Sequence, residues 1–154
     1  MKQKTIEEYI EIIYVLEETE GRAHTGMIAS QMGVKPPSVT EILHKLQKKG
    51  LVKYESYIGA TLTPSGKKMA RELMKKHKVI ADFLEIIGVE RGLAEIDACQ
   101  IEHHVSSVTM EHLEKFVRFV HYAPHDPKWM EHFKHYCETG ERSICDFYIE
   151  KESN

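Results

Sequence analysis

Apolar residues recur at spacings of three and four along most of the chain, which is the pattern of amphipathic helices with one buried side. Near the start, the repeat predicts a helix that Thr5 caps and that ends at Gly21. Its buried stripe is expected to consist of Ile6, Tyr9, Ile10, Ile13 and Leu16. This first helix therefore has one face for a core and one face for solvent.

Two shorter helices are expected next. Thr25 is a suitable cap for the second helix, which Gly33 ends in a position suited to a left-handed turn. The third helix is expected to begin at Pro36, because proline is tolerated in the first helical turn, and to end at Gly50. The apolar face of this third helix is formed by Val39, Ile42, Leu43 and Leu46.

The period then changes from that of a helix to that of strands. Residues 51–55 and 60–63 are short strand-like runs on either side of a turn. Thr63 followed by Pro64 is the typical start of a fourth helix, which is expected to run to Ile87. Two short helices with a glycine-containing turn, followed by a hairpin, predict a winged helix-turn-helix.

The second half of the chain is predicted to be entirely helical. Helices are expected over residues 93–105, 108–120 and 129–136, and the residues after Gly140 are expected to form a loose tail. The predicted fold class is mainly α, with an N-terminal winged helix-turn-helix, a small β-hairpin wing and an all-helical second domain. The expected boundaries are 1–74 for DNA binding, 75–140 for metal binding and dimerisation, and 141–154 for the tail.

Composition excludes several classes of protein. The 154 residues are 42% hydrophobic and 29% charged, which is typical of a globular chain rather than a disordered one. No stretch approaches the roughly 18 consecutive apolar residues of a membrane span, and the polar start argues against export. Three cysteines do not make a disulfide framework. A cytoplasmic protein with no membrane partner is expected.

Charge is distributed unevenly along the chain. Residues 1–78 carry 14 basic and 9 acidic side chains, whereas residues 79–154 carry 7 basic and 15 acidic ones. The excess of positive charge is greatest over residues 35–78, with 11 basic against 3 acidic residues. A basic first half and an acidic, histidine-bearing second half suggest that one binds a polyanion and the other a cation.

The third helix and the hairpin carry the residues expected to contact DNA. Serine, threonine and lysine on the exposed side of such a helix can bind phosphates or base edges, and Glu41 can accept from a cytosine amino group. The predicted contact residues are Lys35, Pro37, Ser38, Thr40, Glu41, His44, Lys45, Lys48, Lys53 and Tyr57. Tyr54 is a further candidate in the hairpin. The alternative is that these residues form only the solvated side of a small helical domain.

Candidate metal ligands are concentrated at one point of the second half. Cys99, Glu102 and His103 are spaced i, i+3 and i+4, so their thiol, carboxylate and imidazole would lie on one face of a helix. The alternative is a small buried cysteine beside an ordinary surface pair. Glu8 and Glu11 on the first helix are further candidates, although Glu8 can also close a capping box with Thr5.

Several stretches together resemble the diphtheria toxin repressor family of metal-dependent repressors, in particular its compact manganese branch. The resemblance runs from Thr5 to about Val120. It is carried by residues 8–14, 36–40, 62–66 and 101–104. The resemblance implies that the regulatory ion, or pair of ions, is surrounded by Glu8, Glu11, His77, Cys99, Glu102 and His103.

The resemblance leaves Mn(II) and Fe(II) open as the activating ion. Manganese members have aspartate where this chain has Glu8, and glutamate where it has Cys99; iron members share the cysteine. The ancillary site of the iron members is only partly matched, since Ala81 and Glu95 replace two of its ligands. Carboxylates favour a hard ion such as Mn(II), whereas a thiolate shifts the preference toward Fe(II) or softer ions.

The expected function is that of a metal-activated repressor which binds an operator as a homodimer and controls genes of metal uptake. The alternative is a winged-helix regulator gated by an organic ligand or by cysteine oxidation. No enzymatic activity is expected, because no stretch supplies a general base beside an open coordination position. A second metal site near the C-terminus is a weaker hypothesis, drawn from His121, His125, His132, His135 and Cys137.

Overall fold

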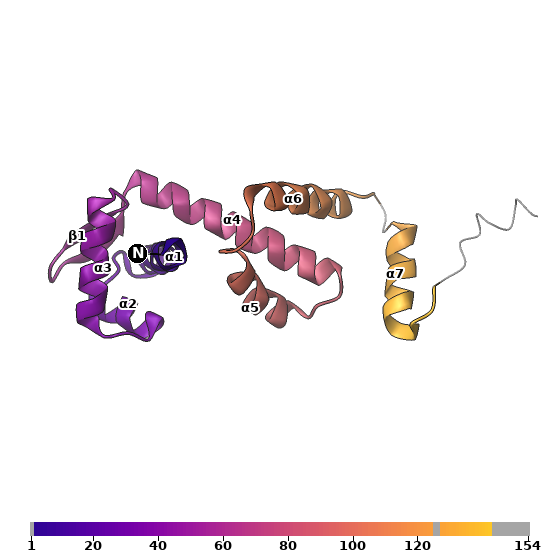
Figure 1. Cartoon of the computed structure of the whole chain (residues 1–154), viewed down its shortest axis with the longest axis horizontal. Helices are drawn as coiled ribbons and strands as arrows, with labels where there is room; N and C mark the ends of the chain where they lie inside the picture. Colours follow the sequence, from indigo (N-terminus) through magenta and orange to yellow (C-terminus); the bar gives the residue numbers. More distant parts are fainter. Residues whose placement is uncertain (1, 125–126, 143–154) are drawn as a thin grey trace, which may run out of the picture.

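The computed structural model describes residues 2–124 and 127–142, which form seven helices and one hairpin. Figure 1 shows how these elements are arranged. In order, the elements are α1 (Gln3–Glu20), α2 (Thr25–Met32), α3 (Pro36–Lys48), β1 (Val52–Glu55), β2 (Gly59–Leu62), α4 (Pro64–Ile86), α5 (Arg91–Ile101), α6 (Ser107–His121) and α7 (Lys128–Thr139). The predicted fold class, mainly helical with a hairpin wing, is confirmed.

The first three helices and the hairpin form one unit around a shared core. Strands β1 and β2 are antiparallel, with Val52 opposite Leu62, and Ala23 adds a single bridge to Ala60. Buried side chains from every element of this unit meet in its core, among them Ile10, Ile13, Ile28, Val39, Leu43, Leu46, Val52 and Leu62. Burial on this scale fixes α3 against the hairpin and leaves the opposite side of α3 exposed.

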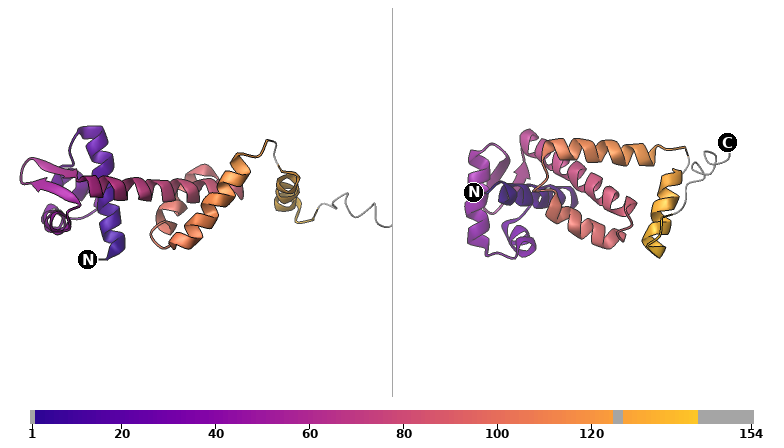
Figure 2. Two further views of the ribbon diagram at one scale, coloured as in Figure 1. Left: turned by 90° about the horizontal axis from the view of Figure 1, so that it is seen from above. Right: turned by 45° about the vertical axis from the view of Figure 1, so that its right-hand side comes forward.

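Helix α4 connects the two halves of the molecule. Its first turn is capped by Thr63, whose hydroxyl accepts from the Gly66 amide at 3.1 Å. A side chain at position 66 would overlap the Leu51 carbonyl oxygen, so glycine permits this close approach to the hairpin. Helix α4 then leaves the winged-helix unit and continues between α5 and α6 (Figure 2).

The second half packs against the far end of α4. A smaller core joins α4, α5 and α6 through Val79, Ile80, Ala81, Ala98, Met110 and Val117. Helix α7 lies at the end of the molecule remote from the hairpin (Figure 1), with Trp129 6.1 Å from Phe116 between ring centroids. Helix α1 of the first unit packs against α4, and α5 packs against α4 as well. The predicted metal ligands lie where these three helices meet.

Several predicted helix boundaries are wrong, including the end of α7, which reaches Thr139 and not residue 136. Helix α1 begins at Gln3, with Lys2 as a cap that makes no side-chain hydrogen bond, so Thr5 lies inside the helix and cannot form the capping box. His24, rather than Thr25, caps α2. Helix α5 stops at Ile101 instead of reaching residue 105, because the chain enters a turn there.

The domain boundaries at 74 and 140 remain predictions. Most of the expected tail, residues 143–154, lies outside the described residues. Over the described parts, no helix combines the length and the apolar character that a membrane crossing requires.

Candidate metal centre

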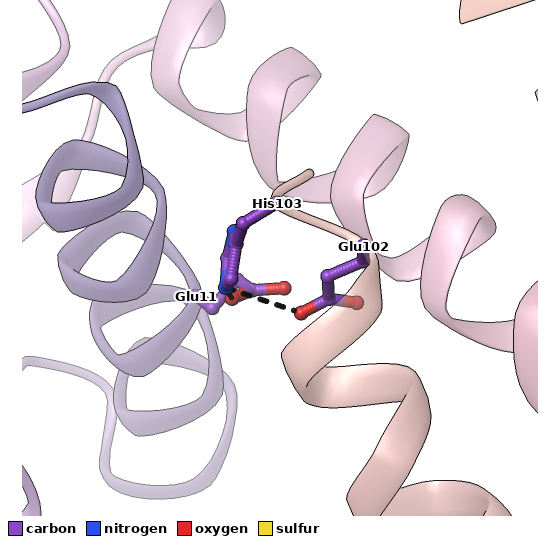
Figure 3. Close-up of side chains that lie close together, drawn as sticks. All are labelled: Glu11, Glu102 and His103. Atoms are coloured by element: carbon purple, nitrogen blue, oxygen red, sulfur yellow. Dashed lines mark ion pairs between the residues drawn. The ribbon is translucent and has the colours of Figure 1, made fainter. Parts of the chain in front are cut away.

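Two segments that are distant in sequence bring the candidate ligands together. Glu11 lies on α1, while Glu102 and His103 occupy the turn that follows α5. Glu102 keeps a helical conformation and its amide donates to the Ala98 carbonyl at 3.0 Å, after which the chain turns. Figure 3 shows that this turn directs the side chains of Glu102 and His103 toward Glu11.

Glu11, Glu102 and His103 form the tightest group of potential ligands. One ligand atom from each lies within 4.8 Å of the others, and this is the one such group of three among residues 2–124 and 127–142. His103 Nε2 is 3.5 Å from Glu102 Oε1 and 4.0 Å from Glu11 Oε2. The spacing suits oxygen and nitrogen atoms around one cation.

Burial makes this group electrostatically unusual. The side chains of Glu102 and His103 are each 1% exposed, and that of Glu11 is 23% exposed. Burial and the nearby Glu102 carboxylate raise the pKa of Glu11 to about 7, and burial likewise raises the pKa of Glu102. A carboxyl group with a pKa near 7, such as that of Glu11, can exchange its proton for a cation.

His77 reaches the same group from α4. Its Nδ1 is 3.1 Å from Glu102 Oε2, and its Nε2 is 2.6 Å from Glu95 Oε2. Burial lowers the pKa of His77, but the contacts with Glu95 and Glu102 outweigh this and leave that pKa above its usual value. Glu95 is itself contacted by Arg91 at 3.3 Å, so a chain of polar contacts links His77 to the molecular surface.

All six predicted ligands line one cavity of about 530 Å³, but they do not all approach one point. Glu8 makes a 3.8 Å ion pair with Lys4, and Cys99 is exposed. Partial burial, together with the carboxylates of Glu102 and Glu11, raises the pKa of the Cys99 thiol. Glu8 and Cys99 therefore lie at the side of the cavity, with their ligand atoms outside the three-residue group.

Sequence reasoning missed Glu7, which contacts His103 Nδ1 at 2.8 Å. It also treated Glu95 only as a departure from the iron members, whereas its carboxylate holds His77. Neither contact has a local sequence signal, since Glu7 and His103 are 96 residues apart and His77 and Glu95 are 18 residues apart. The second predicted metal site is not assembled among the described residues, and His125 lies outside them.

The predicted DNA-contacting residues lie on α3 and the wing. Nine of the ten are exposed and Thr40 is half-buried, with its hydroxyl donating to the Pro36 carbonyl at 3.3 Å. Tyr57 at the tip of the hairpin is fully exposed, and Glu41 pairs with Lys45 at 2.6 Å. Tyr54 is 8% exposed, packs against His44 and lines a surface pocket beside Tyr57, and its contact with DNA stays a prediction. The placement of the other residues is compatible with a groove-facing surface.

Replacing Lys48 with alanine is expected to weaken DNA binding to a similar extent for all sequences. Its ammonium lies on the exposed side of α3, where it can neutralise a phosphate and release a counterion. The slope of log affinity against log salt should fall by about one for each contact removed. Fluorescence anisotropy over a salt series measures this, with Lys115→Ala on α6 as the control. An unchanged slope would exclude Lys48 from the interface.

Two family models match the chain. Residues 1–60 match the iron-dependent repressor N-terminal DNA-binding domain, and residues 63–131 match the iron-dependent repressor metal-binding and dimerisation domain. Together these matches extend over most of the two halves seen in the structure. The exposed α3 surface lies within the first matched range. The cavity is lined from both ranges, since Glu8 and Glu11 belong to the first and His77, Cys99, Glu102 and His103 to the second.

Curated relatives and solved structures agree with these matches. The HTH-type transcriptional regulator MntR of Lysinibacillus sphaericus is 36% identical over 131 residues, covering 85% of this chain and 94% of that protein. MntR of Bacillus pumilus is 40% identical over 119 residues, covering 77% and 83%. The solved manganese regulator SloR is 34% identical with a TM-score of 0.63, and the match covers 78% of this chain but 56% of SloR.

Proposed function

The chain belongs to the iron-dependent, or diphtheria toxin, repressor family and is a metal-dependent DNA-binding repressor; we propose that Glu11, Glu102 and His103 hold its activating ion. His77 contacts Glu102 directly and is the next ligand in this proposal. Glu8 and Cys99 complete the set from the rim of the cavity. The observation that carries the assignment is one buried and one half-buried carboxylate, both with raised pKa values, that face imidazole nitrogen atoms.

The donor set fits a divalent cation. Carboxylate oxygens with one or two imidazoles suit Mn(II) and Fe(II), and the similar structures described as a manganese regulator and as a manganese-dependent repressor favour Mn(II) as the first choice. Cys99 argues less strongly for a softer ion, because its sulfur lies outside the central group of ligand atoms. We therefore rank Mn(II) above Fe(II). One or two ions per subunit are compatible with the cavity.

Gating follows from the origin of the ligands. Glu11 belongs to the winged-helix unit through α1, whereas Glu102 and His103 belong to the second half. A bound divalent cation supplies the positive charge that offsets the repulsion between Glu11 and Glu102. Without that charge, ionised Glu11 and Glu102 favour separation of α1 from the turn after α5. The cation must bind the DNA-competent arrangement more tightly than the alternative.

The same arrangement explains why a dimer is proposed. The metal-binding and dimerisation model covers residues 63–131, and α4 extends from that region to the wing. Two recognition helices held at one separation can enter successive major grooves about one helical turn apart. We propose a homodimer on an operator with two half-sites, which controls genes of metal homeostasis.

Metal titration of DNA binding tests this proposal. A duplex is selected from a random pool with the full chain and Mn(II), and its affinity is then measured with and without the metal at fixed salt. We expect at least about a tenfold gain in affinity with Mn(II), and a comparable or smaller gain with Fe(II) under anaerobic conditions. Equal binding with and without either metal would contradict the proposal and favour gating by an organic ligand or by cysteine oxidation.

A further inference from the structure

A carboxylate outside the predicted ligand set holds the ring of His103. Glu7 lies on α1, one turn before Glu11, and its Oε2 is 2.8 Å from His103 Nδ1. The Glu7 side chain is 12% exposed and that of His103 is 1% exposed. A charge-assisted contact so well shielded from water is worth more than an exposed ion pair. Glu7 therefore restrains the orientation of the His103 ring.

The contact also determines which nitrogen atom of the ring carries a proton. A carboxylate accepts hydrogen bonds and does not donate them when ionised, so the proton in the Glu7 contact belongs to His103 Nδ1. The other ring nitrogen, Nε2, faces Glu102 at 3.5 Å and Glu11 at 4.0 Å. In the neutral ring, the lone pair is then on Nε2, toward the carboxylates of the proposed metal centre.

Glu7 is itself held in place. Its second oxygen, Oε1, accepts a hydrogen bond from Gln3 Nε2 at 2.8 Å. Both carboxylate oxygens are therefore engaged, one by the neighbouring turn of α1 and one by the histidine. This fixes the carboxylate in the orientation that the His103 contact requires.

We propose that Glu7 is a positioning residue for the metal centre, which keeps the proton of His103 on Nδ1 and presents the Nε2 lone pair to the ion. The inference deepens the proposed function and rests on it. An imidazole ligand whose second nitrogen donates to a carboxylate is fixed in tautomer and orientation, and loss of such a partner costs about 10- to 100-fold in metal affinity. Glu7 thus belongs to the site without touching the ion.

Two substitutions at position 7 test this role in the full chain. Glu7→Leu removes the acceptor, whereas Glu7→Gln retains a carbonyl oxygen that can accept from Nδ1. We expect Mn(II) affinity, measured by chelator competition, to fall about 10- to 100-fold for Glu7→Leu and by less for Glu7→Gln. Glu18→Gln, at an exposed position of the same helix, is the control and should bind as the wild type does.

The tautomer of His103 provides a readout that a merely structural role would not change. In metal-free protein at a pH where the ring is neutral, long-range ¹H–¹⁵N NMR should show the proton on Nδ1 in the wild type and on Nε2 in Glu7→Leu. A wild-type ring protonated on Nε2, or Glu7→Leu binding Mn(II) within about twofold of the wild type, would overturn the role of Glu7 alone. Failure of the wild type to bind Mn(II) would contradict the proposed function as well.

Discussion

Replacing Glu102 with glutamine is expected to abolish activation of DNA binding by metal. Glu102 is the most central group of the proposed site, since it contacts His77 at 3.1 Å and His103 at 3.5 Å and belongs to the three-residue group with Glu11. Glutamine keeps the shape of the side chain but removes the charge that a hard cation requires. Mn(II) affinity should fall by about 100-fold or more, which calorimetric titration measures.

The same substitution should not destabilise the metal-free protein. Burial raises the pKa of Glu102 because its charged form is costly in that position, and an ionised Glu102 also repels Glu11. The metal-free melting temperature of Glu102→Gln is therefore expected to equal or exceed that of the wild type. Glu72→Gln, at an exposed position of α4, is the matched control. A large loss of metal-free stability would show that Glu102 supports the fold and not the ion.

Metal affinity is expected to fall steeply as the pH drops below neutrality. The pKa of Glu11 is about 7, so a proton occupies this carboxyl at lower pH and must leave when a cation binds. For one displaced proton, affinity should fall roughly 20-fold between about pH 7.5 and about pH 5.5. Chelator competition across this range measures the slope. An affinity independent of pH would mean that Glu11 is not a ligand.

The stability of the metal-free protein should change in the opposite direction through this group. Because the folded-state pKa of Glu11 lies above its ordinary value of 4.5, its contribution to stability is fully present below about pH 4.5 and is lost as the pH rises through about 7. The raised pKa of His77 likewise favours the folded state at lower pH. The rise in melting temperature on addition of Mn(II) should therefore be larger at about pH 7.5 than at about pH 5.5.

The helical repeat predicted most of the fold because each helix buries a single stripe. The start of α4 was predictable to the residue, since Thr63 and Pro64 are a cap and a first-turn proline with no competing neighbours. The start of α1 was not, because Thr5 is a good cap by type but the helix continues through it to Gln3. The end of α5 was also missed, because no local glycine or proline marks the turn at Glu102.

The candidate site was predictable only in part. The i, i+3, i+4 pattern and the family resemblance indicated Cys99, Glu102 and His103, and the structure brings the last two of these to Glu11. The pattern assumed a continuous helix, whereas Glu102 and His103 lie in the turn after α5. Glu7 has the same residue type as its neighbour Glu8, so only the folded contact with His103 distinguishes the two.

Anomalous diffraction from crystals of the full chain grown with Mn(II) tests the central claim most directly, because it locates the ion independently of DNA binding. The account predicts a manganese peak within bonding distance of a carboxylate oxygen of Glu11, a carboxylate oxygen of Glu102 and Nε2 of His103. A peak bound elsewhere, or a metal-loaded structure in which Glu11 lies far from Glu102, would contradict it.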